Sequence, residues 1–229
     1  MPAPTPWPMV FSAAFLSNIS WSNPDWSGAV NGLVQYDYNL QAQRITHAKG
    51  ATECTKFYHT SPCTLLTNKQ GLYRFLPDPP PGQPPCCLDM PSIHTPPPTW
   101  AQKGKPTDAG LGRVEQRSGS AASAHIWEYP YTGHGGKCAP LNHTTPDSGC
   151  HSYYEVSEDA HIPPSDVGLP ALFTFPAAEG RQDWYYDVKS MSTEALPASL
   201  FDVPASCVNL ACPKSAPRGV RGLPGVAVA

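Results

Sequence analysis

Proline is the residue type that most constrains how this chain can fold. The sequence holds 29 prolines and 18 glycines among its 229 residues. Proline removes a backbone donor and clashes with the preceding turn of a helix, so long helices are excluded over most of the chain. We therefore expect an all-β protein with few, short helices.

Alternating apolar and polar residues predict the strands. Val34, Tyr36 and Tyr38 alternate with polar residues, and Trp184 and Tyr186 repeat the pattern further along. Such alternation puts an apolar row on one face of a strand. We expect the apolar stretch 8–16 to be the first strand, a loop over 91–102 and one helical turn over 191–196. Further strands are predicted over 44–48, 64–76, 113–117, 125–129, 152–157, 169–175 and 199–203.

Composition divides the chain into three parts. Residues 1–8 form a Pro-rich lead-in, and residues 213–229 form a tail rich in Pro, Gly and Ala that lacks aromatic residues. Such terminal segments usually lie outside a packed core. Between them we predict a single β domain over residues 9–212.

Eight cysteines indicate disulfide bonds, because they lack zinc-site spacing and are too many for a reducing compartment. Buried free thiols are the alternative. A short Cys54 to Cys63 bridge is reasonable, and a Cys138 to Cys150 bridge would close a polar loop. On a strand, Cys86 and Cys87 point in opposite directions and therefore need different partners. Cys207 and Cys212 are the distant candidates for them, although eight cysteines allow 105 connectivities.

Two glycosylation sequons agree with an oxidising compartment. They begin at Asn18 and at Asn142. Together with the cysteines they favour a secreted or lumenal glycoprotein. No apolar run is long enough to span a bilayer, so we expect no transmembrane segment.

Several classes of function lack a signal. Only 14% of the residues are charged and the net charge is −3, which argues against nucleic acid as a partner. The sequence has no phosphate loop, nucleophile elbow or metal-ligand spacing, so we expect no cofactor, no metal and no enzymatic activity. An enzyme would need His125 or His151 to lie within hydrogen-bond distance of an acid and a nucleophile.

Four features follow one another along the chain: Tyr36-Asp37-Tyr38, the Cys86-Cys87 step, Trp100, and the run from Phe201 to Cys207. Their order resembles that of the ependymin-related proteins and their LolA/LolB-like relatives. The resemblance implies a strongly curved antiparallel sheet, a half-open β-barrel around a hydrophobic cavity. It also implies a secreted protein, often dimeric, that binds lipid. The chain departs from the family in its cysteine number, its proline runs and its basic tail.

The predicted function is to bind a hydrophobic small molecule or lipid in such a cavity. The predicted lining residues are Tyr36, Tyr38, Trp127, Phe173, Phe175, Trp184 and Tyr186. The same residues could instead fill a solid core. The alternative function is a structural or adhesive part of an extracellular assembly, as a homodimer or larger, with the surface and tail as contacts.

Overall fold

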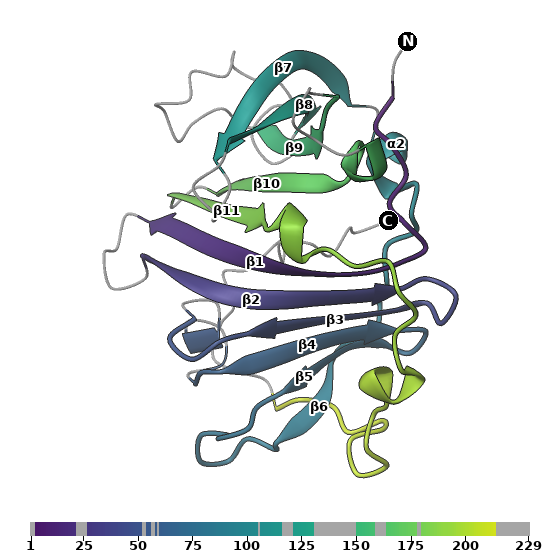
Figure 1. Ribbon diagram of the computed structural model, residues 1–229. Helices are drawn as coiled ribbons and strands as arrows, with labels where there is room; N and C mark the ends of the chain where they lie inside the picture. The colour runs from purple at the N-terminus through teal and green to yellow at the C-terminus, as the bar shows by residue number, and fades with distance from the viewer. Residues whose placement is uncertain are drawn as a thin grey trace. The chain divides into compact units, whose positions relative to one another are not determined.

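The computed structural model describes residues 3–21, 27–51, 54–55, 58, 60–104, 106–115, 121–130, 150–158, 164–177 and 180–213. Most of their regular structure is in eleven strands (Figure 1). The strands are β1 (Val10–Trp21), β2 (Gly28–Asp37), β3 (Ala42–His47), β4 (Cys63–Asn68), β5 (Gly71–Phe75), β6 (Cys86–Met90), β7 (Thr107–Glu115), β8 (Ala121–Pro130), β9 (Cys150–Val156), β10 (Pro170–Ala177) and β11 (Gly180–Tyr186). The named helices are short: α2 (Trp100–Lys103) and the 3-10 turns η3 (Pro164–Asp166), η4 (Val188–Ser190) and η5 (Ala198–Phe201).

The strands form one open antiparallel sheet. Its order is β6-β5-β4-β3-β2-β1-β11-β10-β9-β8-β7, so most neighbours in the sheet are also neighbours in the chain. Within the part built from β7 to β11, β7 is visibly curved (Figure 1). The predicted class, an all-β antiparallel sheet with few short helices and with disulfides, is confirmed.

Two compact units share these strands. The first consists of Met1–Pro8, Phe15–Ser27 and Pro98–Met191, and the second of Met9–Ala14, Gly28–Pro97 and Ser192–Ala229. The predicted single domain over 9–212 stays a prediction. The tail from residue 214 onward lies outside the described residues.

Short polar turns connect the strands of the second unit. After β2, the Asp37 carboxylate accepts hydrogen bonds from the amides of Asn39 and Leu40, at 2.9 and 3.3 Å. After β4, the Asn68 side-chain oxygen accepts a hydrogen bond from the Gln70 backbone amide at 2.8 Å. These Asx-type bonds satisfy backbone donors where the ladder stops. They close the hairpins that pair β2 with β3 and β4 with β5.

Gly71 is required at the start of β5. Its φ is +133°, and an added Cβ would lie 2.6 Å from the Cα of Pro91 and 2.7 Å from the carbonyl oxygen of Met90. Both atoms belong to the backbone, so the close approach cannot be relieved by a side-chain movement. Glycine therefore allows the segment after β6 to pass against β5.

Three disulfide bonds stabilise the second unit. They join Cys54 to Cys63, Cys86 to Cys207, and Cys87 to Cys212. The adjacent Cys86 and Cys87 thus have different partners, as their alternation on a strand predicted. Cys138 lies outside the described residues, and so does the side chain of Cys150, so their bridge stays a prediction.

The C-terminal segment covers the edge strand β6. The Leu88 amide donates to the Leu210 carbonyl at 2.7 Å, and the Cys212 amide donates to the Leu88 carbonyl at 3.0 Å. A parallel bridge pairs Leu88 with Ala211. Exposed edges invite pairing with other chains, and here a disulfide-anchored segment of the same chain occupies part of the edge.

Two local expectations were wrong and one was right in part. Residues 199–203 were predicted as a strand, but η5 occupies Ala198–Phe201. Phe201 is buried against Ala42, Leu66 and Tyr73, and its neighbours Leu200 and Val203 pack against the same cluster, so the segment lacks the alternating faces of a strand. The helical turn predicted over 191–196 is absent, because the turn lies earlier, in η4. The predicted loop over 91–102 is correct up to Thr99, where α2 follows.

Candidate functional site

The structure divides the seven predicted lining residues between the two units. Tyr36 on β2 and Tyr38 in the following turn belong to the second unit. The other five lie on three strands of the first unit: Trp127 on β8, Phe173 and Phe175 on β10, and Trp184 and Tyr186 on β11. The two groups are therefore described separately.

Four aromatic residues of the first unit form one row across the sheet. Trp127 pairs with Tyr153, Tyr153 with Phe173, and Phe173 with Trp184. Residues paired across antiparallel strands lie on the same face, with Cβ atoms about 5 Å apart. We call this set, from four neighbouring strands, the aromatic row. Three of its members were predicted, and Tyr153 was missed.

Ring contacts continue on both sides of the aromatic row. The ring centroids of Phe173 and Phe175 are 4.2 Å apart, and those of Phe15 and Trp184 are 4.7 Å apart. Tyr186 lies 6.3 Å from Phe15. These are stacked and tilted pairs of the kind that stabilise apolar clusters. Four predicted lining residues of the first unit, Phe173, Phe175, Trp184 and Tyr186, therefore belong to a continuous cluster of packed rings.

Two short segments outside the sheet cover the aromatic row. Trp100 of α2 lies 5.2 Å from Phe173 and 5.7 Å from Tyr153, and Trp7 packs edge-on against Trp100 at 5.2 Å. We call residues 3–8 together with 98–104 the cover. Sequence reasoning assigned Trp7 to a Pro-rich lead-in and Trp100 to a loop. A lone tryptophan in each proline-rich segment was the available signal.

Hydrogen bonds hold the cover in place. The Trp7 indole donates to the Tyr153 hydroxyl at 3.1 Å, and the Thr5 amide donates to the Glu155 carboxylate at 2.8 Å. Within the cover, Trp7 donates its amide to the Pro98 carbonyl and Gln102 donates its side-chain amide to the Pro4 carbonyl. The Trp100 indole nitrogen is buried and finds no acceptor among the described residues.

Three ionisable residues on the face of the aromatic row, His151, Tyr153 and Tyr186, are uncharged at neutral pH. Burial lowers the pKa of His151 to about 4, so its imidazole is neutral there. Burial also raises the pKa of Tyr153 and of Tyr186, which keeps both phenols protonated. Glu155 has a pKa raised by burial, an effect opposed by the Thr5 amide.

The opposite face of the same strands contains buried polar residues. Glu128 pairs with Ser152, Ser152 with Thr174, and Thr174 with Asp183, and all four are buried. We call these four residues the polar row. The Ser152 hydroxyl has no hydrogen-bond partner among the described residues. Burial raises the pKa of both Glu128 and Asp183.

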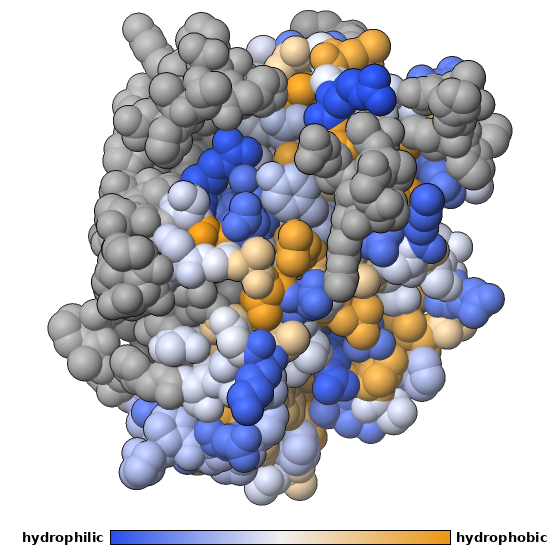
Figure 2. All heavy atoms as spheres, turned by 60° about the vertical axis from the view of Figure 1, so that its left-hand side comes forward, coloured by the Kyte–Doolittle hydropathy of each residue, from blue (hydrophilic) through white to orange (hydrophobic). Residues whose placement is uncertain are grey.

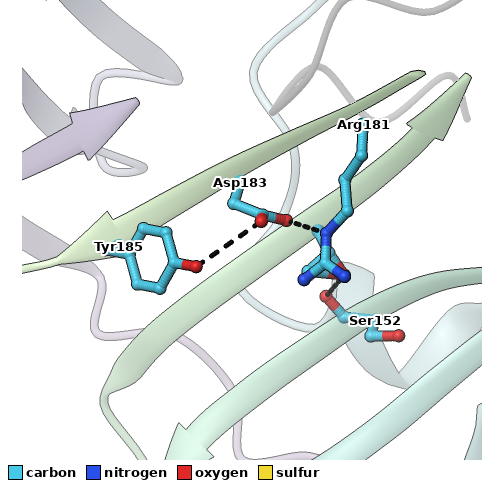
Figure 3. Close-up of polar contacts among 5 residues, drawn as sticks. Ser152, Arg181, Asp183 and Tyr185 are labelled. Carbon is cyan, nitrogen blue, oxygen red and sulfur yellow. Dashed lines mark hydrogen bonds and ion pairs between the residues drawn. The ribbon is translucent and has the colours of Figure 1, made fainter. Parts of the chain in front are cut away.

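Figure 3 shows how Asp183 of the polar row is held. One carboxylate oxygen accepts a hydrogen bond from the Arg181 guanidinium at 2.6 Å, and the other accepts one from the Tyr185 hydroxyl at 3.5 Å. The Thr174 hydroxyl donates to the Ser152 carbonyl at 3.4 Å. Arg181 thus compensates part of the cost of burying Asp183.

His125 contacts an acid, as the enzyme alternative requires, but at the surface. One ring nitrogen lies 2.7 Å from an Asp108 oxygen, and the ring stacks on Trp127 at 4.4 Å. The Gly110 amide and His125 lower the pKa of Asp108. No nucleophile is positioned by a contact of this pair among the described residues. Absence of enzymatic activity stays a prediction.

The second unit contains a pocket beside Tyr38. Its volume is about 320 Å³, and it is lined by Tyr38, Gln41, Asn68, Lys69, His94 and Thr95. Tyr36 stands behind it, fully buried, with its hydroxyl donating to the Pro96 carbonyl at 2.8 Å. Of the predicted lining residues, Tyr38 alone lines this pocket. The other five lining residues are polar and were not predicted.

The exposed surface shows scattered apolar residues. In Figure 2, orange and blue residues are interspersed over the described part of the visible face. Among the residues whose exposure is described, the large apolar ones at the surface are Met9, Leu33, Leu40, Leu111, Val167 and Leu210, none of them aromatic. Among the described residues, no helix is long and apolar enough to cross a membrane, and no group of His, Cys, Asp or Glu is arranged to hold a metal ion. Asn18 is exposed, and Asn142 lies outside the described residues.

Comparisons with known proteins do not indicate a function. No protein-family model matches the chain, and no curated protein matches it. Among solved structures, an uncharacterized conserved protein from Thermus thermophilus is similar, with 10% sequence identity and a TM-score of 0.44. The alignment covers 87% of this chain and 88% of the Thermus chain. At that score the likeness carries no argument about function.

Proposed function

We propose that this chain is a secreted or lumenal, non-enzymatic protein that binds an apolar ligand, such as a lipid acyl chain, against the aromatic row of the first unit. The observation that carries the proposal is the cover. Trp7 and Trp100, which cover the row, belong to two short, proline-flanked segments. A permanent core is usually closed by another sheet or a long helix.

The chemistry of the row suits such a ligand. The rings of Trp127, Phe173 and Trp184 offer apolar area, and His151 is neutral at physiological pH. Burying an acyl chain gains about 0.8 kcal/mol for each CH₂ group. The ligand enters when the cover moves aside, because in the closed state the rings contact one another and the cover.

The unpaired Trp100 indole gives the ligand a polar anchor. Its buried N–H lacks an acceptor among the described residues, and a carboxylate or ester oxygen would supply one. Ligand pockets are commonly apolar with a few such placed polar groups. The resemblance to ependymin-related proteins agrees with this ligand class and stays a prediction. The three disulfides are compatible with an oxidising compartment.

Quenching of tryptophan fluorescence tests the proposal. Protein stripped of lipid is titrated with a brominated 16-carbon fatty acid, since bromine quenches indoles that it contacts. We expect saturable quenching at micromolar concentration, and weaker binding in Phe173→Ala. Leu111→Ala is the matched control, because Leu111 on β7 of the same unit is 74% exposed and is not a member of the row. Binding that is absent, or equally weakened by both variants, would overturn the proposal.

A further inference from the structure

The pocket beside Tyr38 has the chemistry of a second, unrelated ligand site. Its lining combines one aromatic ring with amide, hydroxyl, imidazole and ammonium groups, and no carboxylate is among them. The nearest acid in sequence, Asp37, is occupied by the amides of Asn39 and Leu40. The volume, about 320 Å³, lies at the small end of known ligand pockets.

Two cationic or donor groups of the pocket are available to a ligand. Lys69 is exposed and makes no ion pair with a described residue. One ring nitrogen of His94, Nδ1, lies 3.2 Å from the Asn68 carbonyl oxygen and must donate to it. The second ring nitrogen of His94 has no hydrogen bond to a described residue. The pocket therefore favours an anion at the end formed by Lys69 and His94.

Hydrogen bonds and ring contacts hold Thr95 and Tyr38, two other lining residues of the pocket. The Thr95 hydroxyl donates to the Gln41 carbonyl at 2.8 Å and lies 3.0 Å from the Thr67 hydroxyl. The Tyr38 ring stacks on Tyr36 at 6.3 Å, and Tyr36 packs on Phe11 at 5.2 Å. Both layers belong to the second unit, so the ring that faces a ligand is held in position by two buried rings.

The backbone conformation of Gln41 indicates that its side chain is kept for function rather than for stability. Its φ is +52°, a left-handed conformation that glycine adopts at lower cost. The position nevertheless carries a long side chain with an amide that lines the pocket. A side chain kept in an unfavourable backbone conformation is expected where the side chain itself is needed.

We propose that this pocket binds a sugar acid, a hydroxylated ring that carries one carboxylate. The carboxylate lies at Lys69 and His94, the ring packs on Tyr38, and the amides of Gln41 and Asn68 bind ring hydroxyls. This site is separate from the aromatic row, so its failure would leave the proposed function of the first unit untouched.

Titration of the intact protein with D-glucuronate, D-glucose and acetate tests the site by calorimetry and ligand-observed NMR. We expect glucuronate to bind at least tenfold more tightly than either of the others, and its affinity to fall as salt rises. Binding of glucose and glucuronate with equal affinity, or of acetate as strongly as glucuronate, would overturn the proposal.

Three variants make the test specific. Lys69→Met should weaken glucuronate at least tenfold, whereas Lys49→Met, another exposed lysine outside the pocket, should leave it unchanged. Gln41→Gly should raise the thermal midpoint while weakening glucuronate binding, a combination that a purely structural role would not produce. Equal effects of the two lysine variants, or Gln41→Gly binding at the parent affinity, would contradict the site.

Discussion

The Trp7 indole donates a hydrogen bond to the Tyr153 hydroxyl, at 3.1 Å and across 146 positions of sequence. This contact ties the N-terminal segment to the centre of the aromatic row. It places Trp7, 4% exposed, in the packed interior of the first unit. The cover is thus attached by a definite polar contact in addition to ring packing.

Replacing Trp7 tests how the cover is attached. Trp7→Ala should lower the free energy of unfolding by about 3 kcal/mol, because a buried indole is lost. Trp7→Phe keeps a ring but removes the donor to Tyr153, and should cost about 1 kcal/mol. Guanidinium denaturation measures both. Equal costs, or no cost in either variant, would show that the segment does not pack as described.

Acid should destabilise the first unit through His151. Its pKa in the folded state is about 4, below the ordinary value of 6.5, so the folded state favours the neutral ring. The resulting stabilisation is complete above pH 6.5 and is lost as the pH falls toward 4. Unfolding free energies at pH 7 and pH 4.5 should therefore differ less in His151→Gln than in the parent.

The buried acids of the same unit act in the opposite direction. Glu128, Glu155 and Asp183 have pKa values raised by burial, so their contribution is favourable at low pH and is lost as pH rises. The three acids are present in both the parent and His151→Gln, so their pH-dependent contributions cancel when the two proteins are compared. His94→Gln, the same substitution at an exposed position, is the control variant. An unchanged slope in His151→Gln would contradict the burial of this imidazole.

Ser152→Ala should be neutral or stabilising. The Ser152 side chain is 1% exposed, and its hydroxyl has no partner among the described residues, so removing it removes a desolvated group. We expect a gain of up to about 1 kcal/mol in thermal or chemical denaturation. Thr174→Val, which removes a hydroxyl that does donate, is the matched control and should destabilise. A loss of stability in Ser152→Ala would indicate a partner for its hydroxyl.

The contributions of the two long-range disulfides to the free energy of unfolding should not be additive. Cys86–Cys207 and Cys87–Cys212 close nearly the same loop, so either bond alone removes most of the entropy of the reduced chain. Replacing the Cys87 and Cys212 pair by alanine should cost about 2 to 3 kcal/mol, and replacing both pairs should cost more than twice that. Denaturation midpoints of the second unit measure this. Strictly additive costs would contradict the shared loop.

Strand alternation made most of the fold predictable. The rows at Tyr36 and at Trp184 were visible because apolar and polar residues alternate there, and the separate partners of Cys86 and Cys87 followed from the same geometry. The strand predicted at 199–203 failed because the segment begins as a 3-10 turn, in which Phe201 is buried and Leu200 packs against the same cluster. A short apolar run does not distinguish such a turn from a strand.

The site was less predictable, because long-range contacts create it. Trp7 contacts Trp100, and Trp100 contacts Phe173, although the two tryptophans lie about 90 positions apart in the sequence. The proline-rich composition of both segments argued against their packing in a core. The pocket beside Tyr38 depends on two turns and a loop that adjoin only after the hairpins form. Turn residues such as Gln41 and Lys69 have no periodic pattern to indicate a site.

Native mass spectrometry of the intact protein, purified without detergent or organic solvent, tests whether an apolar ligand binds on the aromatic row. We predict a population carrying an apolar adduct of lipid mass, which Trp100→Ala reduces and which Leu111→Ala retains. Only the bare polypeptide mass in the parent, after exposure to a mixture of fatty acids, would contradict an apolar ligand on the aromatic row.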